Sequence, residues 1–273
     1  MDLTPTQHER YSRQVLLAGV GGNGQKKLLE SSVLCVGTGG LGSAALSYLA
    51  AAGVGRLGLI DGDKVELSNL HRQIIHTTDD LGRVKVESAR ERLRALNPDV
   101  TIEVYPERLT ADNAVEIVSK YDAVVDGCDN FPTRFLTNDA CFFANRPLFF
   151  GSVLRFEGQA TVFFPGRPDE PCYRCLFPEP PPPGYVPTTA EVGILGAVAG
   201  LIGTIQATEC IKYLIGLGTN LNGRLLVYEA LGTTFRPIEV NKDRCCRLCG
   251  DKPEITSLVE YETETPATPS SSP

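Results

Sequence analysis

The stretch Val33-Leu-Cys-Val-Gly37-Thr-Gly39-Gly40-Leu-Gly42 decides the fold class of this chain. An apolar strand runs into closely spaced glycines, and helical spacing follows over residues 43–52 until Gly53. In a strand-turn-helix unit of this kind the first glycine permits a tight turn, the next lets a ligand approach the backbone, and the last lets the helix lie close to the strand. Because the N terminus of a helix attracts anions, the turn predicts a phosphate site. Its candidate binding residues are Gly37, Gly39, Gly40 and Gly42.

Strands and helices alternate along the part of the chain that follows. Apolar strands are expected at residues 56–60, 101–105 and 123–126, with helices at 84–96 and 112–120 between them. This order predicts a largely parallel sheet with helices on both faces, which is a Rossmann-like α/β fold.

The pattern changes after residue 147. Strands are expected at residues 148–153, 159–164, 225–229 and 235–240, joined by short turns. They predict an antiparallel extension of the same sheet.

The chain is expected to form one domain, residues 1–255. Within it, the proline-rich stretch 177–187 cannot join a helix and predicts an extended surface crossover. Residues 256–273 are rich in Thr, Ser, Pro and Glu and have little to bury, so they predict a disordered tail.

Composition excludes several classes of partner. The formal net charge of -7 gives no reason to expect binding to nucleic acid or to an acidic membrane surface. The start of the chain lacks an apolar signal core, and the apolar run 192–205 is too short to cross a bilayer, so it predicts a buried helix instead. Nine cysteines without secretory features suit a reducing compartment, and we expect the cytoplasm.

Two matched cysteine pairs predict a metal centre. The spacing Cys172-x-x-Cys175 and Cys246-x-x-Cys249 lets four thiolates surround one ion, the tetrahedral shell of a structural zinc. A disulfide or redox pair is the alternative, and two separate pairs make it less favoured. Cys245 could replace Cys246, but the spacing would then match the first pair less well.

The glycine turn alone does not separate nucleotide classes. Asp61 stands about 20 residues after it, where an acidic residue pairs with ribose hydroxyls in many dinucleotide-binding proteins. An oxidoreductase that uses NAD or a flavin is therefore the first competing reading.

Charged residues near the ends of the predicted strands favour a triphosphate. Asn69 and Arg72 follow the second strand, Lys85 begins the next helix, and Asp129 follows the strand 123–126. The carboxyl ends of parallel strands form the ligand-binding edge of such sheets. Two cations and a carboxylate suit ATP with magnesium better than a dinucleotide, which carries only a pyrophosphate.

Together these motifs resemble a known family, the adenylyltransferases that activate sulfur-carrier proteins. The family includes the molybdopterin-synthase and thiamine-biosynthesis adenylyltransferases, which are relatives of ubiquitin-activating enzymes. The resemblance runs from about residue 8 to about residue 250. It rests on Arg10-Tyr-Ser-Arg13-Gln14, the glycine turn, Asp61-Gly-Asp63, Ser68-Asn69-Leu-His-Arg72-Gln73, Lys85, Asp126-Gly-Cys-Asp129-Asn130, Glu157-Gly-Gln159 and both cysteine pairs.

The resemblance implies a reaction and a set of roles. The C-terminal glycine of a small ubiquitin-like carrier ending in Gly-Gly would attack the α-phosphorus of ATP, giving an acyl-adenylate and pyrophosphate. Gly40 would line the nucleotide, Asp61 would bind the ribose, and Asp129 would bind magnesium. The phosphates would be held by Asn69, Arg72 and Lys85, with Asp63 and Asn130 also in the nucleotide site. The implied catalytic residues are Arg13, Arg72, Lys85 and Asp129.

The resemblance also implies partners. Arg13 would reach the phosphates of the other subunit in a homodimer. Some relatives carry a C-terminal rhodanese domain, and too few residues follow Cys249 to form one here, so sulfur transfer is expected to need a separate sulfurtransferase. The destination of the sulfur stays open between molybdopterin, thiamine, transfer RNA and another product.

The chain departs from the family pattern at one position. Many relatives have a cysteine after the crossover that bonds to the carrier, and Thr189 stands there in this chain. A threonine hydroxyl without a neighbouring base is a poor acceptor, so no covalent carrier intermediate is assigned. The three histidines, His8, His71 and His76, show no partner pattern and are given no role. A scaffold that binds a carrier without catalysis is the third reading, disfavoured because the charged residues are all present.

Overall fold

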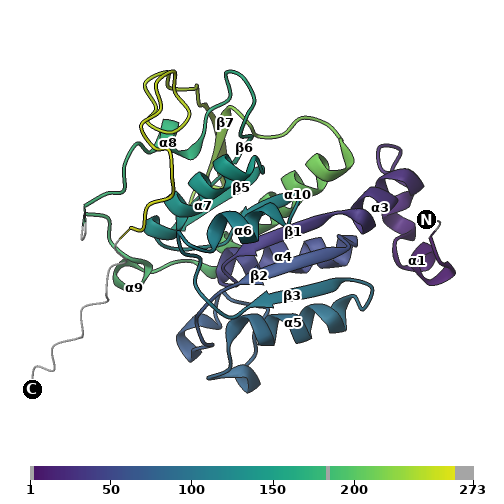
Figure 1. The fold of residues 1–273 in the computed structure, drawn as a ribbon. Coiled ribbons are helices and arrows are strands. Elements are labelled where there is room, and N and C mark those ends of the chain that lie inside the picture. Colours follow the sequence, from purple (N-terminus) through teal and green to yellow (C-terminus); the bar gives the residue numbers. More distant parts are fainter. Residues whose placement is uncertain (1–2, 183–184, 262–273) are drawn as a thin grey trace, which may run out of the picture.

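A computed structural model describes residues 3–182 and 185–261 of the chain. In this part of the chain a single sheet runs in the order β3-β2-β1-β4-β5-β6-β7-β8 (Figure 1). Neighbouring strands from β3 to β5 are parallel, and the pairs from β5 to β8 are antiparallel. The strands are β1 (Ser32–Val36), β2 (Arg56–Ile60), β3 (Thr101–Tyr105), β4 (Ala123–Asp126), β5 (Leu148–Leu154), β6 (Glu157–Phe163), β7 (Arg224–Glu229) and β8 (Thr234–Glu239).

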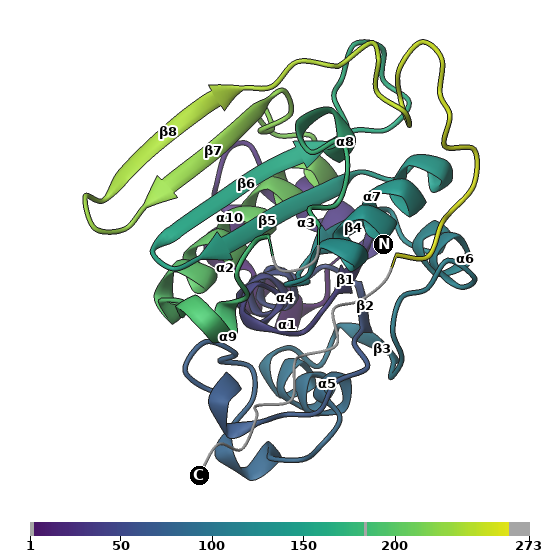
Figure 2. The same ribbon diagram turned by 90° about the vertical axis from the view of Figure 1, so that its left-hand side faces the viewer.

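Helices cover both faces of the parallel part (Figure 2). One core cluster holds residues of α4, α5 and α10, and a second holds residues of α6 and α7. The α-helices are α1 (Pro5–Arg10), α2 (Ser12–Val15), α3 (Gly21–Glu30), α4 (Gly40–Ala52), α5 (Lys85–Leu96), α6 (Ala114–Ser119), α7 (Phe131–Ala144), α8 (Tyr173–Leu176), α9 (Thr189–Val192) and α10 (Gly196–Ile215). Two short 3-10 helices, η1 (Leu67–Asn69) and η2 (Thr78–Asp80), lie between β2 and α5.

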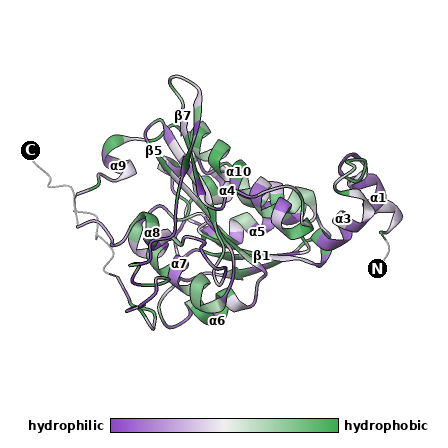
Figure 3. Ribbon diagram, turned by 90° about the horizontal axis from the view of Figure 1, so that it is seen from above, coloured by the Kyte–Doolittle hydropathy of each residue, from purple (hydrophilic) through white to green (hydrophobic). Residues whose placement is uncertain are grey.

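The residues of β1 alternate between these two clusters. Val33 and Cys35 belong to the cluster of α4 and α10, and Leu34 and Val36 to the cluster of α6 and α7. A strand buried on both faces must be apolar at every position, which explains its continuous apolar sequence. Figure 3 shows the same contrast in hydropathy, with a mostly hydrophobic β1 and a mostly hydrophilic α1 at the chain start.

The predicted fold class is confirmed, and the prediction for β5 needs a correction. We expected this strand to open the antiparallel extension, but Val124 pairs with Leu148 in a parallel ladder. The extension begins only with β6. The reason is α7, a helix between β4 and β5 that the sequence pattern did not predict; it returns the chain for one more parallel strand.

The first residues of the predicted tail pack on the domain. Leu258 and Tyr261 lie against the core cluster of α6 and α7, and a carboxylate oxygen of Glu260 accepts a hydrogen bond from the backbone N–H of Ala111 at 2.8 Å. Residues 255–261 therefore form a strap over this face. The remaining tail, residues 262–273, lies outside the described residues.

Among the described residues, no helix is both long and apolar enough to cross a membrane.

Candidate nucleotide site and metal centre

The glycine turn joins β1 to α4 and contacts the loop after β4. Gly37 has a φ of +92°, in the left-handed region that favours glycine. A Cβ on Gly37 would lie 2.7 Å from the carbonyl oxygen of Gly127, and a Cβ on Gly42 would lie 2.1 Å from that of Gly37. The two loops therefore meet backbone to backbone, at the edge where the parallel strands end.

Asp61 fixes this turn. One of its oxygens, Oδ2, accepts hydrogen bonds from the backbone N–H and the hydroxyl of Thr38 at 2.8 and 2.9 Å. Its Oδ1 accepts from the N–H of Asp63 at 2.9 Å. The residue expected to bind ribose thus also holds the shape of the loop that would receive the phosphates.

Lys85 is a buried cation at the first position of α5, with 6% exposure. Its Nζ lies 3.0 Å from a carboxylate oxygen of Asp63, whose side chain is 55% exposed. Arg108 approaches the other oxygen of Asp63 at 3.9 Å. Asp63, expected among the nucleotide ligands, is therefore the present partner of Lys85.

Asn69 and Arg72 lie in the loop that follows β2. The side-chain oxygen of Asn69, which is 9% exposed, accepts from the N–H of Glu66 at 3.3 Å and closes η1. Arg72 donates to the carbonyl oxygen of Ser68 at 3.1 Å. A Cβ on Gly40 would lie 3.5 Å from Cγ of Arg72, so Arg72 packs against the first turn of α4.

Asp129 and Asn130 follow β4, and both are exposed. The side-chain oxygen of Asn130 accepts from the N–H of Thr133 at 2.9 Å, which makes Asn130 the N-cap of α7. Asp129 forms no hydrogen bond or ion pair with any residue that the structure describes. Its carboxylate is therefore free to bind a cation, whereas Asn130 has a structural partner.

A buried polar cluster supports this loop, and the sequence patterns did not point to it. The carboxyl of Asp126 is 1% exposed; burial raises its pKa, and the guanidinium of Arg134 lowers it in part. Arg134 donates to the carbonyl oxygen of Cys128 at 3.1 Å and to the hydroxyl of Ser152 at 2.8 Å. The Cys128 thiol donates to Asp126 at 2.7 Å. The sequence feature that could have indicated this cluster is Arg134, a charged residue in the first turn of α7, but α7 itself was not predicted.

Arg13 lies far from this edge. It is exposed on α2, and the neighbouring Gln14 donates to the carbonyl oxygen of Ala52 at 3.0 Å. Ala52 ends α4, whose first residue, Gly40, lies in the glycine turn, and a helix of 13 residues is about 20 Å long. That distance exceeds the reach of an arginine side chain. Figure 1 likewise shows α1 and α3 at the end of the sheet where β1 begins.

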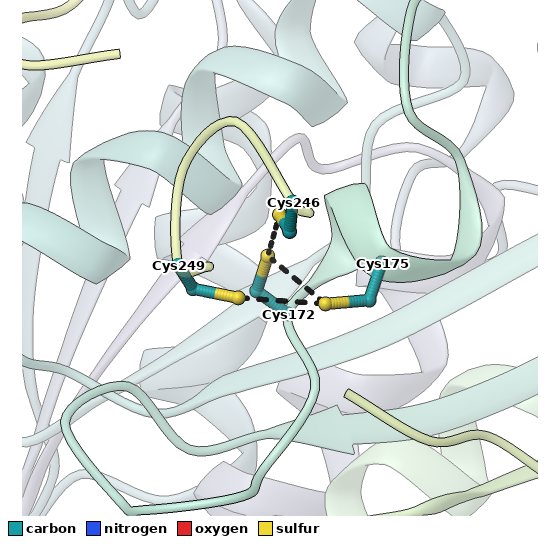
Figure 4. Close-up of side chains that lie close together, drawn as sticks. All are labelled: Cys172, Cys175, Cys246 and Cys249. Carbon is teal, nitrogen blue, oxygen red and sulfur yellow. Dashed lines mark hydrogen bonds between the residues drawn. The ribbon is translucent and has the colours of Figure 1, made fainter. Parts of the chain in front are cut away.

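The four predicted metal ligands converge (Figure 4). Their sulfur atoms all lie within 4.8 Å of one another, and three of the separations are 4.0 Å (Cys172–Cys175), 3.7 Å (Cys172–Cys246) and 3.4 Å (Cys175–Cys249). A tetrahedron with zinc–sulfur bonds of about 2.3 Å has sulfur–sulfur edges of about 3.8 Å. The cluster could therefore hold a metal ion of this size. Cys245 is exposed and lies outside it.

Hydrogen bonding within the cluster shifts the pKa values of the four thiols in different directions. Hydrogen bonding with neighbouring sulfurs, first of all Cys172, lowers the pKa of Cys246, and hydrogen bonding with Cys175 and Cys246 raises that of Cys172. Four thiolates this close repel one another, so a cation among them is needed before all four ionise.

An ion pair lies beneath the first cysteine pair. Arg174, between the two cysteines in sequence, is 2% exposed and donates two hydrogen bonds of 2.8 Å to the carboxylate of Asp139 on α7. It also donates to the carbonyl oxygen of Pro178, where the crossover begins, and to the hydroxyl of Tyr261 in the strap. One buried guanidinium thus ties the metal centre to α7, the crossover and the strap.

Comparison with known proteins places the chain in a family. The model of the ThiF family matches residues 11–248. The chain is 50% identical over 265 residues to the sulfur carrier protein adenylyltransferase of Thermus thermophilus, covering 96% of this chain and 98% of that one. It is 49% identical over 251 residues to the SAMP-activating enzyme E1 of Haloferax volcanii, covering 92% of each.

Other similar proteins are longer. The mouse adenylyltransferase and sulfurtransferase MOCS3 is 50% identical over 254 residues, and the match spans 55% of its length. Among solved structures, Escherichia coli MccB with ATP has a TM-score of 0.77 at 22% identity, covering 89% of this chain and 75% of that one. At this identity the likeness shows the fold alone. The near full-length matches carry the assignment: the chain belongs to the ThiF family and is an adenylyltransferase.

Proposed function

We propose that this protein transfers AMP from ATP to the C-terminal glycine carboxylate of a small ubiquitin-like sulfur carrier, releasing pyrophosphate. The observation that carries the proposal is the placement of Lys85: a buried ammonium at the ligand-binding edge, with an exposed carboxylate as its partner. A buried cation of this kind suits an anionic ligand that can take the place of Asp63. The Thermus and Haloferax relatives support the choice of acceptor.

The nucleotide would lie across the glycine turn. The N–H groups at the start of α4 would face the phosphates, and the adjacent Arg72 and Lys85 would neutralise their charge. Asp61, fixed by Thr38, would lie beside the ribose, and Asn69 would support the loop that carries Arg72. Because the carrier brings its own nucleophile, the side chains are needed for positioning and charge neutralisation only.

The free carboxylate of Asp129 fits a magnesium ion, which prefers oxygen ligands and accompanies phosphates. Bound there, magnesium would neutralise phosphate charge. Asn130, already engaged as the N-cap of α7, would help by fixing the loop rather than by binding the ion. The four cysteines fit a structural zinc, which would hold the two pairs together.

The distance between Arg13 and its own glycine turn supports a homodimer. An arginine at the far end of α4 can act on phosphates only in another subunit. We propose a two-fold dimer in which Arg13 completes the partner's site, as cations supplied in trans do in other phosphoryl-transfer enzymes.

Thr189, at the position where relatives can carry a reactive cysteine, is the first residue of α9 and offers a hydroxyl only. We therefore propose no covalent carrier intermediate, and sulfur delivery by a separate sulfurtransferase stays a prediction. The cytoplasmic location also stays a prediction.

Exchange of labelled pyrophosphate into ATP tests the proposal. Candidate carriers ending in Gly-Gly should support exchange, and the same carriers without the last glycine should not. Asp129→Ala should abolish exchange while leaving thermal unfolding nearly unchanged, because its exposed side chain has no hydrogen-bond or ion-pair partner among the residues that the structure describes. Tight NAD binding without a response to ATP would favour an oxidoreductase, and carrier binding without exchange would favour a scaffold.

A further inference from the structure

His76 is a buried histidine between the glycine turn and α5, with 5% exposure. Its Nε2 lies 3.2 Å from the carbonyl oxygen of Thr38, and its Nδ1 lies 2.9 Å from the hydroxyl oxygen of Ser88. Thr38 belongs to the glycine turn and Ser88 to α5. One side chain therefore joins the two elements that flank the proposed triphosphate.

The contact with Thr38 requires a proton on Nε2, whereas the hydroxyl of Ser88 can either donate to Nδ1 or accept from it. A carbonyl oxygen only accepts, so Nε2 must carry the proton that is donated to Thr38. In the neutral ring Nδ1 is then an acceptor for the Ser88 hydroxyl. Burial lowers the pKa of His76, the hydrogen bond to Thr38 raises it, and the ammonium of Lys85 lowers it again, with Asp80 and Asp61 acting upward. The surroundings as a whole favour the neutral ring.

The residues at each end of this link matter for the nucleotide site. Thr38 is held at its backbone nitrogen and hydroxyl by Asp61 and at its carbonyl oxygen by His76. Ser88 stands one helical turn after Lys85, and residues three apart on a helix share a face. The link therefore fixes the spacing between the start of α4 and the ammonium of Lys85.

A second link joins the same elements through the loop after β2. Asp61 holds Thr38, and Asp63 holds Lys85 at 3.0 Å. Asp63 is half-exposed, and phosphates that bind Lys85 would compete with its carboxylate. The contacts of His76 are buried and neutral, so an anion does not compete for them. When Lys85 turns to a triphosphate, His76 is the link that persists.

We propose, building on the proposed adenylation, that His76 is a positioning residue: as the neutral Nε2–H tautomer it keeps the glycine turn and Lys85 at the spacing that fits ATP. It contacts neither the nucleotide nor the carrier in this role and acts through Thr38 and Ser88. Its loss should therefore weaken the use of ATP and leave the use of the carrier unchanged.

Three substitutions separate positioning from simple packing. His76→Gln places an amide N–H near Nε2 and can still donate to Thr38. His76→Asn places its amide near Nδ1 and loses the bond to Thr38, and His76→Leu loses both bonds while it fills the space. His8→Gln, on an exposed residue of α1, is the matched control. Each variant is tested for Mg·ATP binding by calorimetry, for carrier-dependent exchange and for thermal unfolding.

His76→Asn and His76→Leu should raise the KM for ATP and the Kd of Mg·ATP about tenfold, comparable to losing one hydrogen bond to the phosphates, because the glycine turn and Lys85 are no longer held at the spacing that fits ATP. The KM for the carrier should stay unchanged, and His76→Gln should recover ATP binding to within about threefold of wild type. Equal ATP parameters in all variants would overturn the role of His76. The role would also be overturned if the loss of ATP affinity in each variant followed only its loss of thermal stability, whether or not the new side chain can donate to Thr38.

Nitrogen chemical shifts of His76 in the wild-type protein provide a test that needs no activity. The Nε2–H tautomer at neutral pH is expected, and an Nδ1–H tautomer or a charged ring would overturn the proposal. Wild-type protein that binds no ATP would overturn the adenylation and this role together. If the wild-type protein binds ATP and the His76→Asn variant binds it equally well, the role of His76 is overturned and the proposed adenylation is not.

Discussion

Gly37 and Gly127 touch through their backbones, so that a Cβ on Gly127 would lie 2.5 Å from the carbonyl oxygen of Gly37. The first glycine follows β1 and the second follows β4, and β1 and β4 are neighbours in the sheet. Their contact sets the glycine turn against the loop that carries Asp129. The proposed phosphate and magnesium ligands are thereby placed side by side.

Gly127→Ala should disrupt this contact. The new methyl group meets backbone atoms that cannot rotate away, so we expect a loss of about 1–3 kcal/mol in the free energy of unfolding and weaker Mg·ATP binding. Gly200→Ala in the middle of α10 is the control, because a Cβ there meets nothing within 4 Å. Urea unfolding and calorimetry measure both effects. A Gly127→Ala variant as stable and as active as wild type would contradict the prediction.

Metal removal should destabilise the protein. We expect about one zinc per chain after purification without added metal, because comparable zinc sites in peptides bind with about 10–16 kcal/mol. Cys249→Ser should lose the metal and unfold at a lower temperature, and Cys245→Ser, on the exposed neighbour outside the cluster, should do neither. Elemental analysis and thermal unfolding decide, and a metal-free protein of unchanged stability would refute the zinc site.

Arg13→Ala and Lys85→Ala should complement each other if Arg13 acts in trans. Each variant alone should be inactive. After the subunits have exchanged freely, half of the dimers are mixed, and each mixed dimer has one intact site of two. The rate of pyrophosphate exchange into ATP should therefore recover to about a quarter of the wild-type rate. Size-exclusion chromatography and mass spectrometry verify the dimer and the exchange of subunits. No recovery in verified mixed dimers would show that Arg13 does not complete a partner's site.

The strap formed by residues 255–261 should contribute to the stability of the protein. A chain that stops after Ile255 loses the half-buried Leu258 and Tyr261, which we expect to cost roughly 2 kcal/mol. A chain that stops after Tyr261 keeps both and is the control. Chemical unfolding of the two truncated chains gives the difference directly, and equal stability would mean that the strap only rests on the surface.

The stability of the protein should fall as the pH is lowered from about 6.5, in part because of His76. Its folded-state pKa is lowered, so between that value and the unfolded value the unfolded chain binds more protons and acid favours unfolding. Replacement by Gln removes this contribution. The raised pKa of Asp126 acts in the opposite direction but is present in both proteins, so the difference between wild type and His76→Gln isolates the histidine. Parallel stability curves of the two across this pH range would contradict the prediction.

The local sequence was sufficient to predict those elements whose residues all face the same environment. The strand before Gly37 is apolar at every position because both faces are buried, and the left-handed φ of Gly37 needs glycine; both features can be read directly from the sequence. The cysteine pairs could be predicted for a similar reason, since the spacing within each pair is fixed by the geometry of the ion.

Helix α7 could not be read in the same way. It buries polar side chains, among them Arg134, Asn138 and Asp139, whose partners come from distant parts of the chain. The buried face of α7 mixes these polar side chains with apolar ones such as Phe135 and Ala140, which blurs the apolar stripe on which prediction depends. The role of His76 was hidden for the same reason, because its partners stand 38 and 12 residues away in sequence.

The two cysteine pairs lie 74 residues apart, and α10, β7 and β8 are part of the segment between them. A metal held by all four sulfurs would close a loop whose entropy in the unfolded chain is worth on the order of 4 kcal/mol. Strand β8 is the edge of the sheet and exposes Phe235 and Ile238. An exposed apolar edge can pair with a second chain and lead to aggregation. By holding the chain just beyond β8, the metal would limit fraying of this edge strand, so that loss of the metal is expected to favour aggregation.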